Sequence, residues 1–382
     1  MLPACRTEGD GFSVPTFDLV PSDVEGFMDA LWELQSTFHD CWARSEPRLH
    51  CFDSMVGPCS QLERQSIEPI ALGVEGGTIR GMPRFLSDGS WDEEQRRWHS
   101  HQLVADTLGA PDGVLIFDET GCAKKGSHAV GVARQYGGSL GQVEHGQVGG
   151  LAAYASRQGS ALVEKRFFLP EDWCNDTHAA RRVACQGPQD LTCHTKPQLA
   201  AAMLPAIAHE GLLPCTSLVA DCLYGHSPDC LEAIAACGGG TAFVAIPSET
   251  RGWFQRPPTA EPPYRSKGKA PAQRVVVATA PNACPVAAVA APLPASRWYR
   301  RTVSEGTNGP LAYALARQRV TLCKEGLPER SVWLGIKRTV GAEPADSSAI
   351  SHAPASIPLG LLVWLSGVRW AMEQCFAESN TA

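Results

Sequence analysis

The 382-residue sequence lacks features that mark several common classes of protein. No uninterrupted apolar run reaches the roughly 18 residues that suggest a membrane-spanning helix. The first residues, MLPACRTEGDGF, lack a basic segment followed by an apolar one, so we expect no secretory signal. Aromatic residues make up only 7% of the chain, but 44% is hydrophobic, which excludes a disordered polypeptide and allows two or three domains with cores.

The cysteines also lack the spacing of common metal or redox motifs. The chain has 15 cysteines, but no Cys-x-x-Cys occurs, which excludes zinc ribbons and thioredoxin-type motifs. Because the cysteines are spread thinly over a large chain, we expect reduced thiols in a cytoplasmic protein. Cys222 and His226, four residues apart, are a weaker alternative for nucleophilic chemistry.

Charge is distributed unevenly along the chain. The net charge is −7 overall, yet residues 251–338 hold 15 Lys and Arg against 4 Asp and Glu, a local balance of +11. Aromatic residues are interleaved with them: Trp253, Phe254, Tyr264, Trp298 and Tyr299. A basic segment in an otherwise acidic chain predicts a surface that binds a polyanion, with a merely solvated basic face as the alternative.

Hydrophobic patterning divides the chain into four parts. Residues 1–110 are predicted to be helical, with a helix over 23–44 that begins at Asp23, and either bind DNA or pack on the next domain. Residues 111–250 read as α/β, with strands and helices as follows: strands 113–118, 146–154, 161–169, 216–221 and 241–246; helices 196–209 and 228–237.

The two remaining parts differ from these in composition. Residues 251–338 are predicted to be an inserted β-rich subdomain that carries the basic segment. Within it, the Ala-, Pro- and Val-rich run 278–295 is expected to be a mobile connection. Residues 339–382 end the chain, with a predicted helix over 361–378.

Three carboxylates stand out in this pattern. Asp118 and Asp221 each end an apolar strand, where an open α/β sheet presents functional groups, although a turn or cap is the simpler explanation for one such residue. Glu373 lies in the predicted C-terminal helix, four residues after Arg369, a spacing also typical of a surface ion pair. Carboxylates from separate elements suit two divalent cations that act on a phosphodiester.

Four blocks of the sequence resemble those of bacterial DDE-type insertion-sequence transposases. Residues 117–136 (FDETGCAKKGSHAVGVARQY) are similar to the first-aspartate block of that family, and residues 218–226 (LVADCLYGH) to the second. Residues 304–310 (SEGTNGP) and 364–376 (WLSGVRWAMEQCF) resemble the later blocks, in the family's order. The resemblance extends over roughly two-thirds of the chain.

The resemblance implies a ribonuclease-H-like α/β core, with mixed sheet and flanking helices, interrupted by a β-rich insertion. It implies that Asp118, Asp221 and Glu373 are catalytic and bind Mg²⁺, with Mn²⁺ as a substitute, to cleave and transfer strands at terminal inverted repeats. By analogy, a homodimer would act on double-stranded DNA, both repeats and target, in the bacterial cytoplasm at the nucleoid.

Residues expected to contact DNA come from two sources. By the resemblance, Arg369 contacts phosphate near the cut, and Lys124 and Lys125 do the same unless they form a solvated turn. The basic segment supplies a further set of expected contacts: Arg265, Lys267, Lys269, Arg297, Arg300 and Arg301.

Two positions depart from the family's pattern. A Lys expected seven residues after the Glu is Asn380 here, and the chain ends at Ala382 where relatives continue, so we expect a truncated end. A lost Lys–phosphate contact is worth about 1.5–3 kcal/mol. The alternatives to an active transposase are therefore a remnant or inhibitor that binds DNA without cutting, and a nuclease that ignores the repeats.

Overall fold

The computed structural model describes the greater part of the chain. The described residues are 21–57, 62, 66–74, 77–126, 129–137, 142–184, 187, 191–225, 227–236, 240–262, 274–290, 293–306, 309–339, 347–369, 371–373 and 375–376. They form two compact units. Among the described residues, the larger unit contains 108–372, and the smaller contains 21–107 together with those from Glu373.

The smaller unit is helical, as the N-terminal sequence predicts. Its elements are α1 (Pro21–Ser36), η1 (His39–Cys41), α2 (Ser45–Val56), α3 (Ile67–Gly73), α4 (Gly81–Asp88) and α5 (Glu93–Leu108). Two small apolar clusters hold them: Cys41, Trp42 and Phe85 in one, and Ile70, Ala71 and Met82 in the other. No helix of the described residues is both long and apolar enough to cross a membrane.

The first helix ends earlier than predicted. α1 stops at Ser36 rather than continuing to Arg44. The Ser36 hydroxyl donates to the carbonyl of Glu33 (2.6 Å), and the Phe38 N–H donates to the carbonyl of Gln35 (3.0 Å). These short-range bonds tighten the last turn and end the helix, because Ser and Thr side chains compete for backbone groups.

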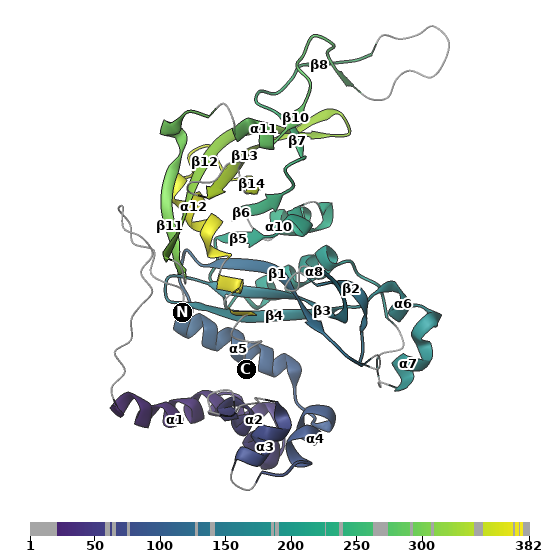
Figure 1. The fold of residues 1–382 in the computed structure, drawn as a ribbon, viewed down its shortest axis with the longest axis vertical. Coiled ribbons are helices and arrows are strands. Elements are labelled where there is room, and N and C mark those ends of the chain that lie inside the picture. Colours follow the sequence, from purple (N-terminus) through teal and green to yellow (C-terminus); the bar gives the residue numbers. More distant parts are fainter. Residues whose placement is uncertain are drawn as a thin grey trace. The chain divides into compact units, whose positions relative to one another are not determined.

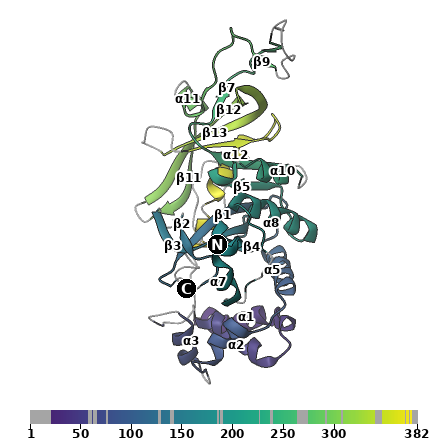
Figure 2. The same cartoon turned by 90° about the vertical axis from the view of Figure 1, so that its right-hand side faces the viewer.

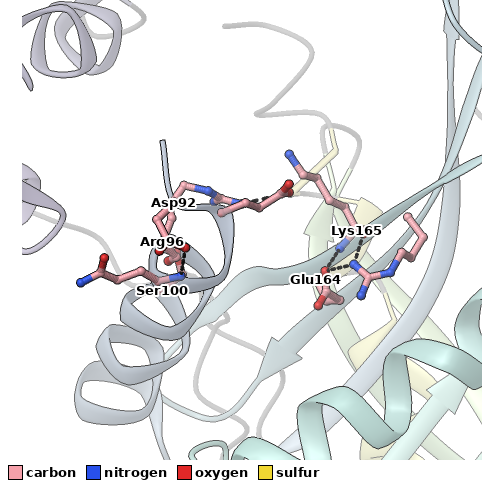
Figure 3. Close-up of polar contacts among 8 residues, drawn as sticks. Asp92, Arg96, Ser100, Glu164 and Lys165 are labelled. Carbon is pink, nitrogen blue, oxygen red and sulfur yellow. Dashed lines mark hydrogen bonds and ion pairs between the residues drawn. The ribbon is translucent and has the colours of Figure 1, made fainter. Parts of the chain in front are cut away.

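Helix α5 starts from a side-chain cap. The N–H of Gln95 donates to Asp92 Oδ1 (2.9 Å), which satisfies one of the amides that a helix start leaves unpaired. One turn further on, the Ser100 hydroxyl donates to the carbonyl of Arg96 (2.9 Å; Figure 3). This cap fixes where α5 begins.

The larger unit is built on a mixed sheet. Its first strands are β1 (Val114–Ala123), β2 (Ala133–Gly137), β3 (Gln142–Ala155), β4 (Ser160–Phe168), β5 (Ser217–Ala220) and β6 (Thr241–Ile246). β3 pairs antiparallel with β1 on one side and with β2 and β4 on the other, while β1, β5 and β6 run parallel (Figure 1). Three antiparallel strands followed by two parallel ones, in the order β4-β3-β1-β5-β6, form the expected ribonuclease-H-like sheet.

Burial explains why these segments form strands. All four residues of β5, SLVA, are buried, as expected for a parallel strand covered on both faces. On β4 the charged residues need partners: Glu164 Oε1 accepts from the Lys165 N–H (2.9 Å) and from Arg166 Nη1 (2.7 Å; Figure 3). The core of the sheet is therefore apolar, and its buried carboxylate is hydrogen-bonded.

Several helices accompany this sheet. They are α6 (Glu171–Cys174), η4 (Asp176–His178), α7 (Ala179–Ala184), α8 (Lys196–Glu210), α9 (Cys222–Gly225), α10 (Pro228–Ala236) and α12 (Leu359–Val368). α8 packs on β3, β4 and α10 (Figure 1), whereas α9 and α12 pack on β5 and β6. Figure 2 shows the same elements from the side. α8 begins with a capping box of Thr195 and Gln198 and ends at Gly211, whose φ of +64° suits glycine.

The basic β-rich segment and the strand that follows it continue the same sheet, apart from a separate two-stranded sheet formed by residues 259–260 and 275–276. Their elements are β7 (Arg251–Trp253), β8 (Thr259–Ala260), β9 (Val275–Val276), β10 (Cys284–Pro285), α11 (Ala287–Ala290), η5 (Ala295–Arg297), β11 (Tyr299–Gly306), β12 (Gly309–Lys324), β13 (Leu327–Thr339) and β14 (Ser347–Ser351). The β12–β13 hairpin joins the core through β14, which pairs with β6. Glu325 and Gly326, both at positive φ, form its two-residue turn.

Three sequence predictions are wrong in detail. The run 278–295 is not a mobile connection, because it contains β10 and α11, and Val286 is buried in the cluster beneath β12 and β13. The helix expected over 361–378 is interrupted: α12 ends at Val368 with Arg369 as its C-cap, and residues 371–373 and 375–376 are also helical. Cys174 and Cys193 form a disulfide across 5.8 Å between Cα atoms, so the expectation of reduced thiols fails for this pair.

Candidate active site

Two aspartates lie side by side on neighbouring parallel strands. β1 and β5 pair in a register that sets Phe117 opposite Ala220, and Asp118 and Asp221 are the next residue of each strand. Asp118 does not end its strand as predicted. β1 pairs with β3 at Asp118, which lies opposite Leu151, and the pairing continues to Ala123. The sheet register therefore brings together two carboxylates that are 103 positions apart in the sequence.

One guanidinium joins the two carboxylates. Arg369 Nε lies 3.1 Å from Asp118 Oδ2, and Arg369 Nη1 lies 3.1 Å from Asp221 Oδ1. The planar fork of arginine suits such paired contacts. Three of the residues singled out in the sequence thus form one cluster within the larger unit.

The two aspartates differ in environment. Asp118 is 6% exposed, and its burial raises the pKa of its carboxyl, an effect that the Arg369 guanidinium and the Glu119 N–H (2.9 Å to Oδ1) oppose. The Asp221 side chain is about one-third exposed, at 36%. The Arg369 guanidinium therefore offsets part of the cost of burying the Asp118 charge.

A second ion pair lies next to Asp118 in the sequence. Lys196 Nζ, at the start of α8, contacts Glu119 Oε1 at 2.8 Å and lies 5.6 Å from the centre of the Phe168 ring. Both charged side chains are mostly buried. This pair links α8 to β1.

The turn after Asp221 is fixed by its backbone. The N–H groups of Tyr224 and Gly225 donate to the Asp221 carbonyl, both at 3.1 Å. A Cβ at Gly225 would lie 2.3 Å from the carbonyl oxygen of Ala245, so only glycine fits there. α9 is therefore held close to β6, and Asp221 is held at the end of β5.

The β12–β13 hairpin anchors the segment that precedes α12. Trp333 Nε1 donates to the carbonyl of Pro354 (3.1 Å), Arg317 donates to that of Ile357, and Arg319 to that of Ala353 (3.4 Å). Both guanidinium groups lie over the Trp333 ring, at 4.5 and 5.3 Å from its centre. Residues 353–357 lead directly into the helix that carries Arg369, so this contact positions the arginine of the site.

The donor set at Asp118 and Asp221 fits a divalent cation. Both carboxylates already face one cationic group, and hard cations such as Mg²⁺ prefer carboxylate oxygens. Because Asp118 and Asp221 directly follow paired residues of neighbouring strands, both carboxylates could bind the same ion.

The third expected carboxylate belongs to the other unit by its contacts. Glu373 is exposed and helical, and the described residues 371–372 and 375–376 are helical as well. The larger unit by itself thus assembles Asp118, Asp221 and Arg369.

The other expected DNA contacts fall into two groups. Lys124, Lys125, Arg297 and Arg300 are exposed, and Arg297 Nη2 lies 3.4 Å from Gln318 Oε1. Arg265, Lys267 and Lys269 lie outside the described residues, as does the side chain of Arg301. His226, considered above only as a partner of Cys222 in nucleophilic chemistry, also lies outside them.

Sequence reasoning missed the residues that support the site. Lys196 and Glu119 are 77 positions apart, and no local sequence pattern predicts their ion pair. The sequence places Arg317, Arg319 and Trp333 in a basic, aromatic-rich segment but does not indicate that they contact one another. Alternation of Arg317 and Arg319 along a strand is the one signal that places them on the same face.

Comparison with known proteins identifies the family. The profile of the family described as DDE superfamily endonuclease matches residues 37–310, and the chain belongs to this family. A probable transposase for insertion sequence element IS701 from Microchaete diplosiphon is 30% identical over 173 residues. That alignment covers 45% of this chain and 42% of the relative, so the chain matches less than half of the relative's length.

A solved structure was also found. A cryo-EM structure of the piggyBac transposase synaptic complex with hairpin DNA aligns with 94% of this chain and 59% of its own chain, at 10% identity and a TM-score of 0.32.

Proposed function

We propose that this chain is a DNA transposase of an insertion sequence, which cleaves and transfers DNA strands at the ends of its element. The observation that carries the proposal is the pair Asp118 and Asp221, in adjacent register on parallel strands and joined by Arg369. Membership of the DDE superfamily endonuclease family supports phosphodiester chemistry at such a pair.

Asp118 and Asp221 would hold the divalent cation, with Glu373 as the proposed third ligand and Mg²⁺ or Mn²⁺ as the ion. When bound, such ions activate the attacking oxygen and stabilise the leaving oxygen of an in-line displacement. The buried Asp118 would fix the position of the ion, and the more exposed Asp221 would face the substrate side. Arg369, once the carboxylates bind a metal, would contact a phosphate near the cut.

Double-stranded DNA is the proposed partner, as terminal repeats and as target. Arg297 and Arg300 are exposed on the basic segment, and Lys124 and Lys125 are exposed next to β1, where each would neutralise a phosphate. The helical unit is proposed to contribute further DNA contacts. We propose that the chain acts as a homodimer in the bacterial cytoplasm.

Strand cleavage tests this function. A labelled duplex that carries the element's own ends would be incubated with the full chain in Mg²⁺ or in EDTA. We expect metal-dependent nicking at the ends by wild type, loss of nicking in Asp118→Asn, and normal nicking in Glu232→Gln. Glu232 is an exposed residue of α10 and serves as the matched carboxylate control.

Two outcomes would contradict the proposal. Specific binding of the ends without cleavage in any metal would leave the alternative of a DNA-binding remnant or inhibitor. Cleavage that is equally fast on duplexes without the repeats would indicate a nuclease rather than a transposase.

A further inference from the structure

A second group of possible metal ligands lies in the helical unit. A carboxylate oxygen of Asp40, Sγ of Cys41 and an imidazole nitrogen of His99 all lie within 4.8 Å of one another. Asp40 and Cys41 come from η1, and His99 comes from α5. These residues are distinct from Asp118 and Asp221 and play no part in the function proposed above.

Neighbouring contacts hold this group in place. Gln95, one turn before His99 on α5, donates from Nε2 to Asp40 Oδ2 (2.7 Å). The Asp92 N–H donates to the carbonyl of Cys41 (3.1 Å), which ties the start of α5 to η1. The three side chains are thus brought together by two elements joined through both backbone and side-chain bonds.

The orientation of His99 is also fixed. Its ring packs edge-on against the rings of Phe38 and Trp98, with centroids 6.1 and 5.1 Å away. His99 Nε2 is buried and lies 2.9 Å from Asp40 Oδ1, so the imidazole and the carboxylate face each other. Two of the three possible ligand atoms are therefore already directed at the same point.

The group is buried on the side of Cys41 and His99 and accessible to solvent on the side of Asp40. Cys41 is 3% exposed and lies in an apolar cluster, the His99 side chain is 15% exposed, and the Asp40 side chain is 58% exposed. Three protein ligands with one solvent-facing side leave a fourth position for water, the arrangement of an open tetrahedral zinc site.

We propose that Asp40, Cys41 and His99 bind a zinc-class divalent ion that fastens η1 to α5. A thiolate and an imidazole select Zn²⁺ or Co²⁺ over Mg²⁺, which prefers oxygen ligands alone. Ligand atoms of a tetrahedral zinc site lie about 3.5 Å apart, given bonds of roughly 2.0–2.3 Å, so the separations within the group, at most 4.8 Å, would need to shorten by up to about 1.3 Å.

Binding requires the Cys41 thiol to lose its proton to solvent as the metal–sulfur bond forms. Burial and the nearby Asp40 raise the pKa of this thiol, so the ion has to displace the proton. The simpler explanation of the group is a His99–Asp40 ion pair that docks η1 on α5 without a metal.

Cobalt spectroscopy on the full chain separates the two explanations. Co²⁺ would be added to chelator-stripped protein, and the near-ultraviolet thiolate-to-cobalt absorption band followed, together with the shift of the melting temperature by Zn²⁺. We expect the band in wild type and in the control Cys122→Ser, which alters an exposed free cysteine. We expect its loss in Cys41→Ser and at least tenfold weaker binding in His99→Gln.

Because Cys41→Ser alters a buried residue and can impair folding, Asp40→Asn provides a second test at an exposed side chain. It should weaken Zn²⁺ and Co²⁺ binding at least tenfold while the protein remains folded. Folded wild type without a cobalt band, or a band of equal strength in Cys41→Ser and Asp40→Asn, would overturn the proposal. Neither readout involves DNA cleavage, so the result is independent of the transposase proposal.

Discussion

Around β1 and β5 the sheet gathers carboxylates about one guanidinium, whereas along β12 and β13 it gathers cations about aromatic rings. Asp118 and Asp221 share Arg369, each at 3.1 Å. In the hairpin, Lys337 Nζ lies 4.0 Å from the centre of the Tyr313 ring, and the guanidinium of Arg338 lies 4.3 Å from that of Trp298.

The two regions differ in whether another cation can take the place of the one that is present. A metal ion can replace a guanidinium between two carboxylates, because both are cations that bind the same oxygens. A cation–π contact, in comparison, is lost when the aromatic ring beneath the arginine is removed. We therefore expect substitutions near β1 and β5 to change metal binding and chemistry, and substitutions in the hairpin to change stability.

The largest expected effect is on cleavage by aspartate variants. Asp118→Asn and Asp221→Asn each keep the side-chain shape but remove the charge that, in the proposed function, would bind the ion. Because a metal supplies several kcal/mol of transition-state stabilisation, we expect the single-turnover rate to fall at least about 10³-fold. A fall of less than tenfold in both variants would contradict a metal site at this pair.

In the hairpin, Trp333→Ala should lower the free energy of unfolding by about 2–3 kcal/mol. It removes two cation–ring contacts and the hydrogen bond to Pro354. Trp333→Phe retains a ring and should cost about 1 kcal/mol, the typical value of one hydrogen bond. Urea denaturation measures both, and equal stability of the two variants would show that the ring contacts contribute nothing.

Removal of the shared cation should have a smaller effect that depends on metal. Arg369→Gln leaves two neighbouring carboxylates without their guanidinium, and since that side chain is about one-third exposed, we expect a loss of about 1–2 kcal/mol in EDTA. Mn²⁺ should restore more stability to the variant than it adds to wild type, as measured by thermal unfolding. Equal stabilisation of both proteins would rule out exchange at this position.

The smallest expected effect concerns a single exposed arginine of the basic segment. Arg300→Ala should weaken duplex binding a few-fold and reduce the slope of log affinity against log salt by about 1, because one phosphate contact is lost. Arg157→Ala, which alters an exposed arginine paired with Asp112 in the turn before β4, is the matched control and should change neither quantity. Identical effects of both variants would show that binding is not confined to the basic segment.

Much of the fold could be predicted because local patterns and tertiary structure agree. The apolar runs of β5 and β6 and the capped helix α8 were identified within one or two residues. The predictions failed where contacts between distant residues determine the structure. β1 extends past Asp118 because β3 pairs with it. Val286 is buried although the sequence around it is rich in Ala and Pro.

The candidate site was predictable in its parts but not in its geometry. The strand pattern singled out Asp118 and Asp221, and the resemblance to a family supported both and added a role for Arg369. It contained no signal that Arg369 contacts both carboxylates, or that Trp333 holds the segment before α12, because these contacts join residues far apart in the chain.

Direct measurement of metal binding tests the central claim that Asp118 and Asp221 form a cation site. Mn²⁺ binding to the full chain without DNA would be followed by electron paramagnetic resonance for wild type, Asp118→Asn, Asp221→Asn and the control Glu232→Gln. We predict binding by wild type and Glu232→Gln, with affinity at least tenfold weaker in each aspartate variant. Equal Mn²⁺ affinity in all four proteins would contradict the account.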